Sequence, residues 1–152
     1  MKNQWLRLGG ILSFAIALLH VVIIFIGAPA YRYFGAGEDM ATAAESGSAF
    51  PALLTLFLVA IFAIWGFYGL SGAGVIRRLP LLKIALILIG VVYTLRGVAV
   101  FQQLFQIAIS SAEAAPREIA FSLVSLIIGL AYLIGTVTSW RSLGASNRIV
   151  QP

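Results

Sequence analysis

The sequence predicts an all-α integral membrane protein, a bundle of four transmembrane helices with both termini in the cytoplasm. Three observations lead to this prediction. The chain of 152 residues is 61% hydrophobic and 10% charged, whereas a soluble domain carries about 25% charged residues. Four apolar runs are long enough to cross a membrane. The sign of the charge alternates from one connection to the next.

The four runs form a single predicted membrane domain over residues 1–152. We expect spans at about 5–27, 50–70, 81–110 and 117–140. The mean hydropathy of +1.04 supports this, because a separate soluble domain would lower it.

The placement of charge predicts the orientation of the spans. Basic residues lie before the first run, between the second and third, and after the fourth: Lys2, Arg7, Arg77, Arg78, Lys83, Arg141 and Arg148. The other two connections hold all five acids: Glu38, Asp39, Glu45, Glu113 and Glu118. By the positive-inside rule, the basic connections face the cytoplasm of a bacterial-type inner membrane. A net charge of +5 placed in short connections does not indicate a nucleic-acid partner.

The first span runs from Trp5, an interfacial anchor, to Gly27, and Pro29 ends it. A signal peptide cleaved after Ala30 is the alternative, because residues 28–30 carry an A-x-A pattern. The apolar run of residues 8–26 is longer than the 7–15 residues of a signal-peptide core. We therefore favour a retained span.

The first outer connection, residues 28–49, begins APAYRYFGAG and continues EDMATAAESG. The second half predicts a short helix, with acids in its first turn and Gly47 at its end. We expect this helix to lie at the membrane interface, with the aromatic residues of the connection at headgroup level.

The remaining elements follow from proline, glycine and hydropathy. The second span begins at Phe50, with Pro51 in its first turn, and SGAGVIRRLP forms a short cytoplasmic turn. The third span starts after Pro80. Residues 111–116 turn outside, and the fourth span leads into a polar tail.

Arg96 is a permanent charge inside the third span. Such a charge at the bilayer centre costs at least ~2.5 kcal/mol. At 1.5 Å per residue, Arg96 lies roughly 20 Å from the cytoplasmic edge and His20 of the first span about 18 Å. The two basic groups therefore share a depth in the outer half, although Arg96 could instead extend outward to the interface.

The neighbours of Arg96 on the predicted helix are polar. Tyr93, Arg96 and Gln103 lie within roughly 80° of one another at 100° per residue, and Gln106 extends the arc. Gly90 and Gly97 lie beside this arc and permit close helix approach. The fourth span has a stripe at helical spacing, formed by Glu118, Ser122, Ser125, Gly129, Tyr132 and Thr136. The first span has a seam of small residues and one histidine, formed by Gly10, Ser13, Ala17 and His20.

These stripes predict a polar pocket in the outer half of the bundle. The residues expected to line it are His20, Tyr93, Arg96, Gln103, Gln106, Glu118, Ser122 and Ser125, with Tyr31 and Arg32 over its mouth. An arginine with amides and hydroxyls suits an anionic or carbonyl-bearing amphiphile, such as a lipid phosphate, a fatty acid or a quinone. The alternative is that an ion pair of Arg96 with Glu118 or an acid of a connection, and a hydrogen bond from His20 to a serine, only lock the helices together.

Three functions remain open. The first is binding or transport of a lipid-like, fatty-acid-like or quinone-like ligand. The second is a non-catalytic accessory subunit that contacts membrane lipids, another membrane protein or a second copy of the chain. The third is an enzyme with His20 as a base. The chain has no cysteine and one histidine, so we expect no metal and no cofactor.

Overall fold

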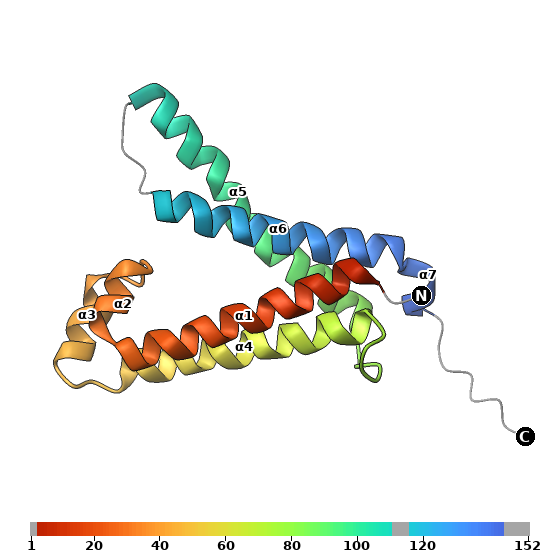
Figure 1. Cartoon of the computed structure of the whole chain (residues 1–152), viewed down its shortest axis with the longest axis horizontal. Helices are drawn as coiled ribbons and strands as arrows, with labels where there is room; N and C mark the ends of the chain where they lie inside the picture. Colours follow the sequence, from red (N-terminus) through yellow and green to blue (C-terminus); the bar gives the residue numbers. More distant parts are fainter. Residues whose placement is uncertain (1–2, 111–115, 145–152) are drawn as a thin grey trace, which may run out of the picture. The chain divides into compact units, whose positions relative to one another are not determined.

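The structure, a computed structural model, describes residues 3–110 and 116–144 (Figure 1). Within these ranges every regular element is a helix. The helices are α1 (Gln4–Ile26), α2 (Ala28–Tyr33), α3 (Glu38–Glu45), α4 (Phe50–Gly72), α5 (Leu82–Ser110), α6 (Pro116–Thr138) and α7 (Trp140–Gly144).

Four of these helices, α1, α4, α5 and α6, are long and apolar enough to cross a membrane. They indicate a multi-pass membrane protein. Each predicted span begins and ends within two residues of the corresponding helix, because runs of this hydropathy have no competing structure in lipid.

The chain forms two compact units. Unit 1 comprises Met1–Gly10 and Phe67–Pro152, and unit 2 comprises Ile11–Gly66. We describe each unit by itself.

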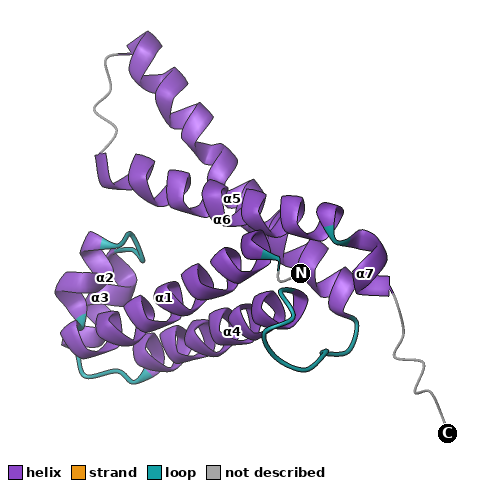
Figure 2. Cartoon of the chain, turned by 45° about the vertical axis from the view of Figure 1, so that its right-hand side comes forward, coloured by secondary structure: helices purple, strands orange, loops and turns teal. Residues whose placement is uncertain are grey.

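In unit 1, α5 and α6 pack closely through small residues (Figures 1 and 2). Gly97 lies so near the backbone of Leu126 that a Cβ added to it would come within 2.5 Å of the Leu126 Cα. One turn earlier on α5, Thr94 lies against Gly129. Gly90 in turn lies against Leu133. The two helices are antiparallel, and the predicted close approach at Gly90 and Gly97 is confirmed.

Tyr132 of α6 is the centre of unit 1, and its side chain is fully buried. Its ring is stacked with that of Tyr93 from α5, with 6.2 Å between the ring centroids. Its ring edge lies over Gly9 of α1 and its hydroxyl beside Gly69 of α4, where added Cβ atoms would each come within 2.9 Å. Segments of all four long helices therefore meet around one tyrosine, and glycine leaves the room for it.

Asn3 ties the beginning of the chain to the end of α6. Its Nδ2 donates hydrogen bonds to the Gly135 carbonyl at 2.7 Å and to the Ser139 Oγ at 2.5 Å. Its Oδ1 accepts a hydrogen bond from the Leu6 backbone N–H at 3.1 Å, which satisfies a donor of the first turn of α1. Leu6 itself is buried against Gly135.

The connection between α4 and α5 is organised by Ser71. The Ser71 hydroxyl donates to the Arg77 carbonyl at 3.0 Å and accepts from the Leu79 N–H at 2.9 Å. The hydroxyl of Tyr68 donates to the Pro80 carbonyl at 3.2 Å. These hydrogen bonds satisfy backbone N–H and C=O groups of the connection, which have no helical partner.

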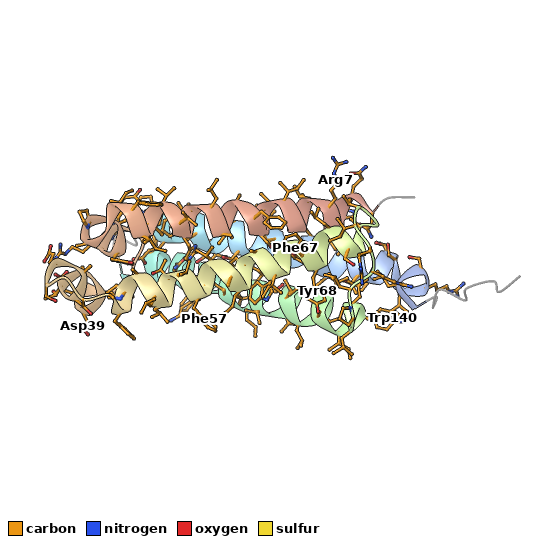
Figure 3. The ribbon with its side chains drawn as sticks, turned by 90° about the horizontal axis from the view of Figure 1, so that it is seen from below. Arg7, Asp39, Phe57, Phe67, Tyr68 and Trp140 are labelled. Atoms are coloured by element: carbon orange, nitrogen blue, oxygen red, sulfur yellow. The ribbon has the colours of Figure 1, made fainter. Side chains whose placement is uncertain are left out.

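In unit 2, α1 and α4 run antiparallel. The missing side chain of Gly66 admits the ring of Phe14. Farther along α1, the ring of His20 packs on Phe62, with 4.9 Å between centroids. Phe57 projects outward from α4 (Figure 3), as expected of a side chain that faces lipid.

The connection between α1 and α4 holds two helices, one more than the sequence predicted. The chain turns at Gly27, whose φ of 76° suits glycine, and α2 then begins with Pro29 in its first turn. Pro29 therefore starts a second helix as well as ending the first. The predicted helix over EDMATAAE is present as α3.

Tyr31 of α2 is a buried residue of this connection, and its expected place at headgroup level stays a prediction. Its side chain is buried with Ile23, Ala28, Ala30 and Ala41, and its hydroxyl lies 3.4 Å from the Thr55 Oγ1. The reason is that α2 packs on α3, and Tyr31 lies on the contact face. Tyr33, two residues on, is exposed.

Candidate functional site

The residues predicted to line one pocket belong to both units. His20, Tyr31 and Arg32 lie in unit 2. The others lie in unit 1: Tyr93, Arg96, Gln103, Glu118, Ser122 and Ser125. Gln106 is part of α5, but its side chain lies outside the described residues. We therefore consider each group within its own unit.

Arg96 is the middle residue of α5 and its side chain is exposed. It was expected to share the interior with Tyr93, but only Tyr93 is buried. Three residues at 100° each place the two side chains about 60° apart around the helix. Tyr93 takes the contact with Tyr132, and Arg96 lies at the flank of that contact.

Among the residues the structure describes, Arg96 has neither a hydrogen bond nor an ion pair. The alternative Arg96–Glu118 ion pair is therefore not formed within them. Glu118, in the first turn of α6, is exposed. The expected role of Arg96 as a ligand anchor stays a prediction.

Two polar atoms of α5 are buried without a hydrogen-bond partner in the described part of the chain. They are the Oε1 of Gln103 and the Oγ1 of Thr94. Gln103 was among the predicted pocket residues, and Thr94 was not. Thr94 shares a face with Gly90 and Gly97 at spacings of four and three residues, and this pattern could have found it.

The stripe on α6 is buried as predicted for Ser122, Ser125, Gly129, Tyr132 and Thr136. The hydroxyl of Ser125 donates to the Phe121 carbonyl at 2.9 Å, and that of Thr136 donates to the Tyr132 carbonyl at 2.7 Å. These two hydroxyl protons are thus taken by the helix itself. The stripe supplies small side chains for close packing against α5.

His20 is placed as a packing residue of unit 2. Its Nδ1 is 2.8 Å from the Ile16 carbonyl oxygen, a distance that suits donation by the Nδ1–H tautomer. One face of its ring packs on Phe62. A packing role for His20 was the alternative to its predicted ligand and base roles. The contacts of the ring agree with the packing role.

Arg32 links α2 and α3, the two short helices between α1 and α4. Its guanidinium donates to Glu38 at 2.6 Å from Nη2 and to Glu45 at 2.6 Å from Nη1. Both carboxylates lie in α3, one at each end. The hydrogen bonds from Arg32 lower the pKa of Glu38 and of Glu45 from 4.5, and the two carboxylates raise the pKa of the guanidinium above its ordinary value.

Acid is expected to weaken the ion pairs of Arg32, which hold α2 and α3 together in the connection between α1 and α4. Each carboxylate binds protons more weakly when folded than when unfolded, so its contribution is complete above pH 4.5 and is lost as the pH falls below it. We expect a small effect, because the three side chains are solvated. Hydrogen exchange of residues 28–47 should be faster at pH 3.5 than at pH 6 after correction for intrinsic rates.

The matched control is Arg32→Gln, which removes the partner of both carboxylates. In this variant, the excess exchange at low pH should disappear, because exchange is already fast at pH 6. Equal protection of the wild-type segment at both pH values would contradict the prediction.

The geometry thus leaves Arg96 as a charge in mid-helix with no partner among residues 3–110 and 116–144, while Arg32 and His20 already have protein contacts. Searches against protein-family models, curated proteins and solved structures each found no match to this chain.

Proposed function

We propose that the protein binds a small anionic amphiphile within the membrane and that Arg96 is its charge anchor. The observation that carries the proposal is that Arg96 is exposed at the middle of α5 and has no partner among the described residues. A charge at this position is costly unless it is paired. A guanidinium pairs best with a phosphate or a carboxylate, which it can bind through two parallel hydrogen bonds.

The need for a negatively charged partner at Arg96 favours anionic ligands over neutral ones. A lipid phosphate or a fatty-acid carboxylate supplies a counter-ion for Arg96, whereas a quinone supplies only neutral carbonyl acceptors. Gln103 lies two turns from Arg96, roughly 10 Å along α5, and its Oε1 is a buried acceptor without a described partner. A headgroup with both a phosphate and a hydroxyl or amine would satisfy both residues. We therefore favour a phospholipid-like ligand.

We also propose that both termini face the cytoplasm of a bacterial-type inner membrane, which places the Gln103 half of α5 on the outer side. The alternating charge of the connections supports this orientation. The short helices α2 and α3 would then lie at the outer interface. The alternative function is a non-catalytic accessory subunit of a membrane complex, in which a protein acid would pair with Arg96.

The ligand proposal predicts a bound mass that depends on Arg96. Native mass spectrometry of the wild-type protein, released gently from membranes, should show a defined lipid-like adduct. Arg96→Ala should lose most of that adduct, because removing a charge-assisted bidentate contact weakens binding by ~1.5–3 kcal/mol, roughly tenfold to a hundredfold.

Two variants serve as controls for this experiment. Arg117→Ala removes one positive charge from the first turn of α6 and should keep the adduct. Arg96→Lys keeps the charge but loses the planar fork, and its occupancy should fall between those of wild type and Arg96→Ala. An adduct retained in full by Arg96→Ala would overturn the ligand proposal and favour the accessory-subunit alternative.

The orientation can be tested directly because the chain contains no cysteine. Single-cysteine variants at Ser46, after α3, and at Ser142, in α7, place one thiol in each kind of connection. In intact cells with a permeabilised outer membrane, a membrane-impermeant maleimide should label Ser46→Cys and not Ser142→Cys. The reverse pattern would show that the proposed orientation is inverted.

A further inference from the structure

We infer a second binding surface, at the α7 end of unit 1, for the headgroup of a phospholipid that carries two phosphates. This surface is separate from Arg96. It comprises five cations contributed by α1, the α4–α5 connection, α5 and α7: Arg7, Arg77, Arg78, Lys83 and Arg141.

Protein contacts bring these segments to one end of the unit. Arg78 Nη2 donates to the Ser142 carbonyl at 2.6 Å, which joins the α4–α5 connection to α7. Lys83 Nζ lies 4.3 Å from the centroid of the Trp140 ring, a cation–π contact at the first residue of α7. Asn3 joins the first turn of α1 to Ser139, next to Trp140. Figure 3 shows Arg7 and Trp140 at this end, with Arg7 pointing away from α1.

The side chains of three of the five cations have no hydrogen bond or ion pair to another described residue. They are Arg7, Arg77 and Arg141, and all three are exposed. In the described part of unit 1 the one acid is Glu118, in the first turn of α6. It lies twenty residues before the end of α6, roughly 30 Å along the helix axis. Arg78 and Lys83 hold the surface together, and the three arginines are left to meet an external anion.

The flank of this surface suits acyl chains. Ile84 and Leu88 follow one another at helical spacing along the start of α5, and Leu81 immediately precedes the helix. Each of the three is more than half exposed. Trp140 is half exposed beside Lys83, as in the aromatic belt where membrane helices meet the headgroups. Cations at a helix end above an apolar stripe match a phospholipid better than a soluble anion.

The number of cations favours two phosphates over one. A headgroup with one phosphate carries a single negative charge, which one arginine can neutralise through a bidentate contact. Three unpaired arginines beside Arg78 and Lys83 exceed that need, and basic clusters at the ends of membrane helices are known to bind two-phosphate headgroups such as that of cardiolipin. We therefore commit to cardiolipin, rather than a monophosphate lipid, as the occupant.

The test is native mass spectrometry of delipidated protein titrated with cardiolipin, phosphatidylglycerol or phosphatidylcholine. The wild-type protein should bind cardiolipin more tightly than phosphatidylglycerol, and phosphatidylcholine most weakly. The double variant Arg77→Gln/Arg141→Gln should bind cardiolipin on the order of tenfold more weakly or worse, since each surface cation contributes several-fold. These arginines have no described protein partner, so the variant should fold, and Arg77→Lys/Arg141→Lys should largely restore binding.

The control is Arg117→Gln, which removes an arginine elsewhere in unit 1 and should leave cardiolipin affinity unchanged. Equal affinity of the wild type for cardiolipin and phosphatidylglycerol would overturn the inference, as would full cardiolipin binding by Arg77→Gln/Arg141→Gln. If Arg96→Gln loses cardiolipin while Arg77→Gln/Arg141→Gln keeps it, the lipid binds at Arg96, which supports the proposed function and overturns this surface. If the Arg96-dependent adduct is absent while this selectivity holds, only the proposed function fails.

Discussion

Replacing Tyr132 with alanine is expected to lower the free energy of unfolding by about 3 kcal/mol or more, the cost of deleting a large buried aromatic side chain. Tyr132 is fully buried, stacked on Tyr93, and seated against Gly9 and Gly69. The glycines cannot fill the space that the ring leaves, because they have no side chain. Unfolding in mixed micelles, followed by loss of helical signal on addition of denaturing detergent, measures the change.

Tyr132→Phe is the control for this substitution. It keeps the stacked ring and removes only the hydroxyl beside Gly69, so we expect a loss of about 1 kcal/mol. If the alanine variant unfolds at the same detergent fraction as the phenylalanine variant, the ring is not the centre of packing that the structure indicates.

Gly97→Ala is expected to destabilise the protein by about 1–3 kcal/mol, the usual cost of overpacking. The sign is informative, because alanine in a helix interior is favoured over glycine by about 1 kcal/mol in isolation. The added Cβ would lie 2.5 Å from both the backbone nitrogen and the Cα of Leu126, and backbone atoms cannot rotate away. Helices α5 and α6 must therefore separate. The same denaturation in mixed micelles, together with the yield of folded protein, tests this.

Gly90→Ala provides a graded comparison on the same helix. Its Cβ would meet chiefly the end of the Leu133 side chain, at 2.8 Å, which can change rotamer. Gly129→Ala should resemble Gly97→Ala, because its neighbours include the backbone nitrogen of Thr94 at 2.6 Å. A Gly97→Ala variant that is more stable than the wild type would show that α5 and α6 are not held at this distance.

The sequence predicts the long helices well and their partners less well. A membrane span is specified by its own hydropathy, which a single sequence contains, so the ends of the four spans were predicted within two residues. The buried stripe on α6 was predicted because lipid offers hydroxyl groups no partner. Glu118, the first residue of that stripe, is exposed, since it lies in the first turn of α6 where a carboxylate can reach solvent.

The connection between α1 and α4 contains a helix, α2, that the sequence alone did not predict. APAYRY forms a six-residue helix that is stable only because α3 packs on it, and this contact is a tertiary interaction without a local signal. The same packing buries Tyr31, and no local feature of the sequence predicts that burial. Arg32 was predicted at the mouth of a pocket, and its two acid partners lie six and thirteen residues away in sequence.

The candidate site was predicted in part for a similar reason. Helical spacing predicted that Tyr93, Arg96 and Gln103 lie on one arc of α5. All three belong to unit 1, but Tyr93 is buried and Arg96 is exposed. Spacing alone does not say which member of an arc meets the neighbouring helix, and here Tyr93 does so because Tyr132 offers it a stacking partner. His20 shares a depth with Arg96 on a simple count of helix rise, but it belongs to unit 2.

The bonds of Asn3 have a consequence for how the protein is made. Asn3 is synthesised long before its acceptor on Gly135, which follows 132 residues later. Unit 2 is continuous in sequence and can assemble while synthesis proceeds, whereas unit 1 must wait for its last helix. A nascent chain that stops before α6 would leave the hollow at Gly9 and Gly69 unfilled, and such incomplete chains should be recognisable to membrane quality-control proteases.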